Sequence, residues 1–135
     1  MQESVQYGPF QPEHLDGVVS CAGVLGWPSY ADPTATLAAF TAPGAVTWVA
    51  SQDRRVIGLA HLLTNGVVHS HLSLIGVLPE YRRRGIAQTL VTKAFQQSGG
   101  KWLDLCADAG SENFYRSFRH EPFAGFRIYP TGSAR

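Results

Sequence analysis

The sequence SLIGVLPEYRRRGIAQTLVTKAF at residues 73–95 decides the fold. Its first part is an apolar strand that must end near Leu78, because Pro79 cannot donate to a sheet ladder. From Ile86 onward apolar residues recur at helical spacing, and Gly99-Gly100 is a natural stop for that helix. The stretch therefore predicts a buried strand, a tight loop and an amphipathic helix.

The loop between this strand and this helix has the features of a polyphosphate-binding site. The free amides at a helix start and the positive end of the helix dipole attract an anion. Gly85 and the small Ala87 let the backbone approach a ligand closely. The adjacent Arg82, Arg83 and Arg84 add positive charge. The same three arginines also fit a solvated basic turn or a patch for an RNA backbone.

The segment Arg82-Arg83-Arg84-Gly85-Ile86-Ala87 resembles the Gln/Arg-x-x-Gly-x-Gly/Ala signature of the GNAT superfamily of acetyl-CoA-dependent N-acetyltransferases. An apolar strand ending in Val-x-Pro precedes it and an amphipathic helix follows it. Downstream, Glu112-Asn113-Phe114-Tyr115-Arg116-Ser117-Phe118 is similar to the Phe-Tyr-containing helix of that family. The resemblance implies a small bacterial-type member, an acyltransferase enzyme with acetyl-CoA as cosubstrate and no metal.

Length, charge and cysteine content limit the other possible protein classes. A chain of 135 residues predicts a single domain over residues 1–135. The net charge of +1 argues against a nucleic-acid binder that works by bulk electrostatics. Cys21 and Cys106 lack metal-ligand spacing and are interpreted as reduced, buried thiols. With no run that resembles a signal peptide or a membrane span, we expect a cytoplasmic protein that binds neither membrane nor nucleic acid.

The order of expected elements predicts an α/β fold, with a mixed, mostly antiparallel central sheet flanked by helices, as the resemblance implies. The family closes with a two-strand hairpin, whereas this chain ends six residues after Tyr129. In this shortened C-terminal region one strand is therefore missing or supplied by a neighbouring subunit of a homodimer. The expected strands are 5–10, 45–51, 56–63, 67–77 after an Asn65-Gly66 hairpin, 102–106 and 126–129, and the expected helices are 12–25, 34–40, 86–98 and 111–117.

Acetyl transfer to an amine requires a base, because an alkylammonium ion with a pKa of about 10.4 must first lose a proton. His71 is the candidate base. It lies six residues before Val77, where several relatives carry a glutamate or histidine that faces the cleft. His69 points to the same face of the strand as His71 but lies two residues further from the thioester. A structural strand histidine bonded to the backbone is the alternative for His71, and direct or water-mediated action stays open.

Tyr115 aligns with the family tyrosine near the CoA sulfur, so the resemblance implies that it is the general acid for the leaving thiolate. A buried hydroxyl satisfied elsewhere is the alternative. Phe114 is assigned to the cofactor or to the core. Two departures from the family affect this segment: Asp108 replaces a frequent asparagine, and Arg119-His120-Glu121-Pro122-Phe123 replaces a Gly-Phe pair.

The resemblance also assigns residues to acetyl-CoA. In the family, the strand residues before the proline pair with pantetheine through main-chain atoms, and the loop and helix start hold the pyrophosphate. Gly76 fits a close backbone approach, and a packing glycine is the alternative. The assigned residues are Ile75, Gly76, Val77, Arg82, Arg83, Arg84, Gly85, Ile86 and Ala87.

The acceptor side of the family's cleft is lined by the first helix–loop–helix, which makes Trp27 and Tyr30 candidate substrate contacts. Both aromatics fit a core-capping role as well. Ser73 is the third candidate, as a residue that holds a water or orients the substrate. No acidic cluster marks a polyamine or aminoglycoside site, and the aromatic pair hints at an apolar or aromatic amine.

We therefore expect an N-acetyltransferase that moves an acetyl group directly from acetyl-CoA to an amine of a small molecule. Two alternatives stay open. One is acetylation of a protein N-terminus or lysine. The other is a non-catalytic acyl-CoA-binding sensor domain of the same fold.

Overall fold

The computed structural model describes residues 4–131 and divides into two compact units, Met1–Asp104 and Leu105–Arg135. The single domain expected over residues 1–135 stays a prediction. Within residues 4–131, none of the helices has the length and apolar character needed to cross a bilayer. The elements are β1 Gln6–Pro9, η1 Pro12–His14, α1 Leu15–Leu25, η2 Pro28–Tyr30, α2 Pro33–Phe40, β2 Ala45–Gln52, β3 Arg55–Thr64, β4 His69–Val77, η3 Pro79–Tyr81, α3 Ile86–Ser98, β5 Trp102–Asp104 and α4 Glu112–Arg116.

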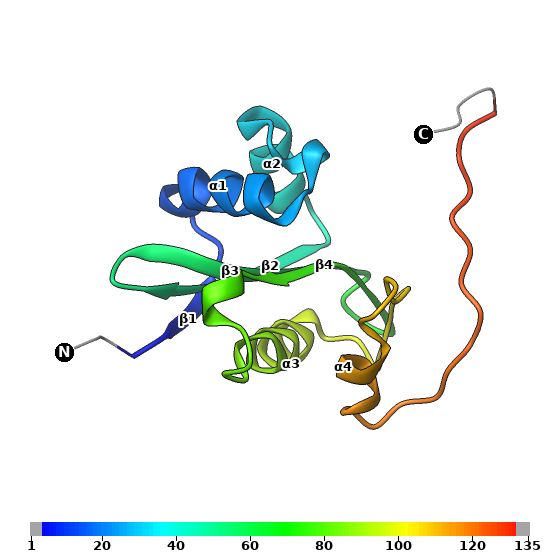
Figure 1. The fold of residues 1–135 in the computed structure, drawn as a ribbon. Coiled ribbons are helices and arrows are strands. Elements are labelled where there is room, and N and C mark those ends of the chain that lie inside the picture. Colours follow the sequence, from blue (N-terminus) through cyan, green and yellow to red (C-terminus); the bar gives the residue numbers. More distant parts are fainter. Residues whose placement is uncertain (1–3, 132–135) are drawn as a thin grey trace. The chain divides into compact units, whose positions relative to one another are not determined.

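The first unit is built on a sheet with the strand order β1-β2-β3-β4-β5. The pairs from β1 to β4 are antiparallel, and β5 pairs with β4 in parallel after the crossover through α3. Helices α1 and α2 cover one face of the sheet and α3 covers the other (Figure 1). This mixed, mostly antiparallel arrangement confirms the predicted fold class.

Both faces of the sheet are packed by apolar side chains from the covering helices. The amphipathic pattern predicted for α3 is confirmed, because Leu90, Val91 and Ala94 are all buried. Helix α3 ends at Ser98, and Gly99 after it adopts the left-handed conformation that the stop signal requires. On the α1–α2 face the core cluster consists of Val18, Cys21, Phe40, Val49, Val56, Leu59 and Leu78.

The two cysteines differ from each other. Cys21 is buried, and its Sγ donates to the Val56 carbonyl at 3.3 Å. Burial raises the pKa of the Cys21 thiol to about 11, against an opposing effect of the Arg55 charge, so this thiol stays protonated. Cys106 is exposed, and its predicted burial is wrong.

The strand expected from Val67 begins two residues later, at His69. The Asn65 side chain explains the difference. Its Oδ1 accepts hydrogen bonds from the amides of Val67, Val68 and His69 at 3.0, 2.9 and 3.1 Å. An asparagine that binds three successive amides offers the backbone an alternative to a strand ladder, so residues 65–68 form a loop.

The strand expected over Phe126–Tyr129 is absent from the structure, and this prediction is wrong. No ladder within residues 4–131 includes this segment. Its Phe126 and Ile128 side chains are 87% and 90% exposed. A strand needs a hydrogen-bonded neighbour in addition to a suitable sequence, and the described chain supplies none here. The homodimer that would supply one stays a prediction.

One histidine of the first unit is fully buried beside an aromatic ring. His61 on β3 is 2% exposed and lies against the Phe40 ring, with ring centroids 4.6 Å apart. Its Nδ1 lies 2.7 Å from the Thr47 Oγ1. Burial lowers the pKa of His61 to about 4, because the charged imidazolium has lost its hydration.

We predict that wild-type stability falls in acid because of this group. The folded pKa of about 4 lies below the unfolded value of about 6.5, so the unfolded chain binds the proton first. The stabilising contribution is complete above the unfolded pKa and is lost as the pH falls toward 4, by about 3 kcal/mol in all. Denaturant titrations of the wild type and His61→Gln across this window measure it. Equal pH slopes in the two proteins would contradict the prediction.

Candidate active site

The sheet opens between β4 and β5, at the place where the sequence predicted the cofactor strand. The two strands pair through only three residues each, ending with His71 opposite Asp104. Strand β4 continues to Val77, and no strand within residues 4–131 pairs with it on that side. We call this divergence after His71 and Asp104 the fork. Beyond the fork, the main-chain groups of β4 on this side can form hydrogen bonds with an extended ligand that lies alongside the strand.

A β-bulge lies inside the fork at Ser73. Leu72 pairs with Leu62 and Leu74 pairs with His61, so Ser73 is the extra residue on β4. Ser73 itself is exposed. Side chains alternate between the two faces of a strand, and an extra residue shifts this alternation by one position. Residues before and after the bulge therefore follow different alternation patterns. The bulge therefore separates the part of β4 that carries the histidines from the part assigned to the cofactor.

Beyond the bulge, Gly76 faces the α1–α2 layer. A Cβ at this position would lie 2.7 Å from Leu25 Cδ1 and 2.8 Å from Trp27 Cη2. A Cβ at this distance would displace the Leu25 or Trp27 side chain, so the side-chain space at Gly76 is filled by packing. The flanking Ile75 is half-buried and Val77 is buried, which leaves their main-chain atoms as the groups that could meet a ligand.

The two aromatic candidates for acceptor binding lie on the same face. Trp27 is half-buried and packs against β4 at Gly76. Tyr30 packs on the core, with its ring 5.6 Å from the Phe40 ring and 6.3 Å from that of His61. The core-capping interpretation accounts for the contacts of Tyr30. Trp27 caps the core and also lies beside the main chain of the predicted cofactor strand.

Two histidines and one carboxylate lie on neighbouring strands at the base of the fork. His71 is half-buried and stands in register with Asp104. The His69 Nε2 lies 2.8 Å from the Asp104 Oδ2, and the two side chains are 49% and 32% exposed. Sequence reasoning missed Asp104. The sequence shows Asp104 as one carboxylate within the apolar run Trp102-Leu103-Asp104-Leu105. Its histidine partner follows only from the parallel register of β4 and β5.

The loop from β4 to α3, residues 78–85, leads into a helix start whose first backbone amides have no helical acceptor. Gly85 has a φ of 77°, and Ile86 begins α3 without a side-chain cap. The first helical donor is the Thr89 amide, which binds the Gly85 carbonyl at 3.1 Å. The amides of residues 86–88 therefore have no acceptor within the helix. No protein atom lies within 4 Å of a Cβ built on Gly85, so the space at the start of α3 is open.

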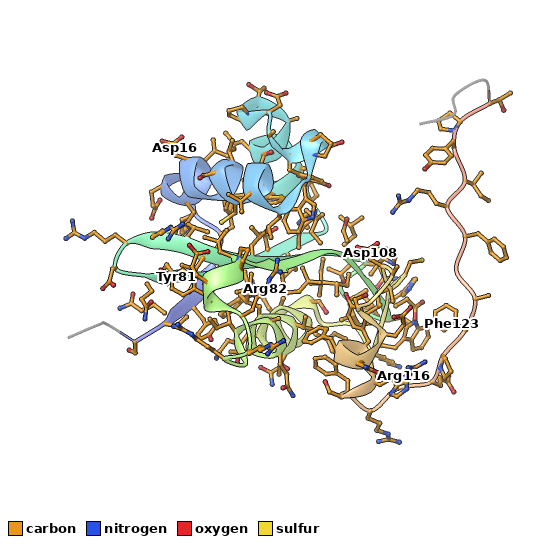
Figure 2. All side chains as sticks on the ribbon, in the orientation of Figure 1. Asp16, Tyr81, Arg82, Asp108, Arg116 and Phe123 are labelled. Atoms are coloured by element: carbon orange, nitrogen blue, oxygen red, sulfur yellow. The ribbon has the colours of Figure 1, made fainter. Side chains whose placement is uncertain are left out.

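Two of the three loop arginines bind the protein itself. The Arg82 Nε donates to the Val77 carbonyl at 3.0 Å, and the Arg84 guanidinium lies 5.3 Å from the centre of the Tyr81 ring. Figure 2 shows Tyr81 and Arg82 on the segment that links β4 to α3. Arg83 is exposed and has a φ of 65°. Within residues 4–131 no such contact holds its side chain, so Arg83 is the arginine left to meet an anion.

These observations test whether the residues fit the diphosphate of acetyl-CoA. Open amides at the start of a 13-residue helix, a left-handed glycine and an arginine without a protein contact have the chemistry that a phosphate group needs. Ile86 is buried and Ala87 half-buried, so they contribute amides and little else. The fit is good.

The second unit contains the other predicted catalytic residue. Tyr115 lies on α4, with its ring 5.0 Å from that of the half-buried Phe114. Burial, and secondly the negative charge of Asp108, raise the pKa of the Tyr115 hydroxyl above its ordinary value. The hydroxyl is therefore protonated at neutral pH, as a general acid must be.

A hollow of about 770 Å³ lies away from the fork, between α1 and the β2–β3 turn. Its walls carry charges of both signs, including Asp16, which Figure 2 labels on α1, together with Asp53 and Arg54. It contains none of the residues predicted for acetyl-CoA or for the acceptor. Because the amides and the fork lie elsewhere, we assign the site from the backbone geometry and not from this hollow.

Solved structures share the fold of the chain. The aminoglycoside N-acetyltransferase AAC(6')-Iy in complex with CoA superposes with a TM-score of 0.77 at 18% identity, covering 98% of this chain and 97% of that one. A protein from Agrobacterium tumefaciens that is described as a putative acetyltransferase gives 0.75 at 22% identity, with coverages of 93% and 99%. An aminoglycoside acetyltransferase from an uncultured soil metagenome, in complex with sisomicin, gives 0.74 at 14% identity, with coverages of 94% and 97%.

A search of curated protein sequences found no match. A family model does match: the Acetyltransferase (GNAT) family covers residues 17–119, which include the fork, the β4–α3 loop and α4. The match spans most of the chain and agrees with the fold of the first unit. The chain belongs to the GNAT acetyltransferase family.

Proposed function

We propose that the protein is an N-acetyltransferase that moves an acetyl group from acetyl-CoA directly to an amine of a small molecule. The proposal rests on one observation: the fork and the free amides at the start of α3 lie at opposite ends of the unpaired part of β4 and the loop that follows it. Bound acetyl-CoA supplies a thioester carbonyl that an amine can attack. The main chain at residues 75–77 would hold it, and one amide there would donate to the carbonyl oxygen.

The solved relatives support the choice of cosubstrate and broaden the choice of acceptor. AAC(6')-Iy binds CoA, and the metagenomic relative binds sisomicin, each on the same fold. Trp27 and Tyr30 are the aromatic residues of the predicted acceptor side, which fits an amine with an apolar or aromatic body. Ser73, exposed at the bulge, would orient that acceptor or hold a water.

We assign the proton transfers to His71 and Tyr115. His71 takes one proton from the acceptor ammonium, directly or through water. Tyr115 gives its proton to the CoA sulfur as the carbon–sulfur bond breaks. It regains a proton from the nitrogen that has formed the amide bond. One proton is released overall, from His71 to solvent, and the tyrosine ends as it began.

We also place the protein in the cytoplasm and propose that it forms a homodimer. Cys21 and Cys106 are both free thiols, and free thiols persist in a reducing compartment. The exposed Phe126 and Ile128 offer apolar surface that a second copy could cover.

The function is tested by following thiol release from acetyl-CoA with a panel of primary amines. We expect turnover with at least one amine and none with the alcohol of the same shape. Calorimetry with acetyl-CoA runs in parallel. Binding of acetyl-CoA without turnover of any small amine or peptide would overturn the enzyme proposal and leave an acyl-CoA-binding domain.

We predict that Tyr115→Phe lowers kcat about 10- to 100-fold, because the thiolate then leaves without a proton donor. Calorimetry should give an unchanged Kd for acetyl-CoA, since a phenylalanine keeps the ring. Tyr129→Phe is the matched control, because Tyr129 lies in the same unit and is 39% exposed. An unchanged kcat in Tyr115→Phe would remove this residue from the chemistry.

A further inference from the structure

Asp104 is a carboxylate at the base of the fork. It is the last residue of β5 and the last to pair with β4, opposite His71. Paired residues of neighbouring strands place their side chains on the same face of a sheet, with Cα atoms about 4.8 Å apart. The Asp104 carboxylate is 32% exposed, so solvent and small ligands reach it.

His69 holds this carboxylate in one orientation. Its Nε2–H donates to the Asp104 Oδ2 at 2.8 Å. Within residues 4–131 no other hydrogen bond ends on this carboxylate, which leaves Oδ1 to accept from a ligand. An ionised carboxylate accepts several hydrogen bonds, so one from His69 leaves capacity for a cation.

The charges along β4 are arranged for two different ligands. Beyond Val77, the β4–α3 loop carries Arg82, Arg83 and Arg84, and the start of α3 carries the open amides. The fork base, six residues earlier on β4 and about 20 Å away, carries Asp104 and two histidines. One end of the strand segment therefore suits an anion and the other suits a cation.

We propose that Asp104 is a substrate-binding residue that receives the ammonium group of the acceptor, and that His69 is the positioning residue that holds it. The inference rests on the proposed function and deepens it. An alkylamine arrives as a cation at neutral pH, since its pKa is about 10.4. Asp104 binds that cation beside His71, which then takes the proton. The site selects alkylamines, which are charged at neutral pH, over arylamines and alcohols, which are not.

A purely structural role for the pair predicts different results. Strand β5 has only three ladder pairs, so the His69–Asp104 bond also helps to hold its end. Asp104→Asn separates the two roles. Its amide oxygen still accepts from His69, but its negative charge is gone. The variant should fold with wild-type thermal stability and bind acetyl-CoA with an unchanged Kd.

The kinetic test uses benzylamine, which is cationic at neutral pH, and aniline, which is neutral. In Asp104→Asn we expect the KM for benzylamine to rise about 10- to 100-fold, with a much smaller change in kcat. Kinetics with aniline should not change, and Asp104→Glu should recover part of the affinity for benzylamine. His69→Leu should raise the KM as well, whereas His69→Gln, which keeps a donor, should raise it less.

A second readout does not depend on turnover. Imidazole resonances of His69 and His71 are followed by NMR while benzylamine is added to the protein without acetyl-CoA. We expect saturable shifts in the wild type, none in Asp104→Asn and none with benzyl alcohol. Shifts without any acetylation would retain the ammonium site and overturn the proposed function. Two results would overturn the ammonium site. One is acetylation of benzylamine by Asp104→Asn with an unchanged KM, and the other is no interaction of the wild type with benzylamine.

Discussion

Gly85→Glu is expected to abolish acetyl-CoA binding, raising the calorimetric Kd at least about 100-fold. Gly85 precedes the first residue of α3, and the space in front of it is free of protein atoms. A glutamate carboxylate would occupy that space and repel the diphosphate. Two unit charges 5 Å apart interact by about 3 kcal/mol at an effective dielectric constant of 20, which corresponds to a Kd ratio of more than 100.

Backbone strain has to be separated from charge in this experiment. Gly85 has a φ of 77°, a conformation that costs most side chains about 1–2 kcal/mol. Gly85→Asn is the matched control, because asparagine tolerates the left-handed conformation and carries no charge. We expect its Kd to stay within about fivefold of the wild type. Equal binding by Gly85→Glu and the wild type would show that the diphosphate does not lie at this loop.

The features that the sequence predicted at the correct residues are those with a local physical cause. Pro79 cannot donate to a ladder, and β4 ends at Val77. The left-handed Gly99 ends α3 as the glycine pair indicated. The apolar period between these residues predicts the buried face of α3, and Leu90 and Ala94 occupy it. Each of these constraints acts within one turn or one strand, so a single sequence reveals it.

Two features that the sequence did not reveal depend on a partner distant in the chain, and a third depends on a nearby side chain. Phe126–Tyr129 has strand-forming residues, but a strand also needs a neighbour and the described chain offers none. The extra residue at Ser73 is visible only against the register of β3. At the start of β4, three amides bind Asn65, a local competition that the two-residue hairpin pattern does not include.

The same distinction applies to the candidate site. The glycine and amides of the β4–α3 loop follow from a contiguous motif, and the structure gives them the expected geometry. Asp104 became visible only when the parallel register placed it opposite His71 and within hydrogen-bond distance of His69. Its partner lies 35 residues earlier in the chain. Pairings of this kind are set by the crossover through α3, which no local pattern encodes.

His71→Ala is expected to lower kcat for amine acetylation by about 10²- to 10⁴-fold, the usual contribution of a positioned base. The acceptor amine must lose a proton before its nitrogen can attack, and His71 is the half-buried histidine on β4 next to the fork. The Kd for acetyl-CoA should change less than about twofold in calorimetry, because the assigned cofactor contacts come from residues 75–77 and the β4–α3 loop.

Two further substitutions distinguish basicity from shape. His71→Gln keeps the size and a hydrogen-bonding group but cannot accept the proton, so its kcat should be as low as that of His71→Ala. His71→Glu restores a base and should recover part of the rate. His120→Ala is the control, because His120 is an exposed histidine of the second unit outside the assigned machinery. Full activity in His71→Gln would move the base elsewhere, and His69, already oriented by Asp104, would be the next residue to test.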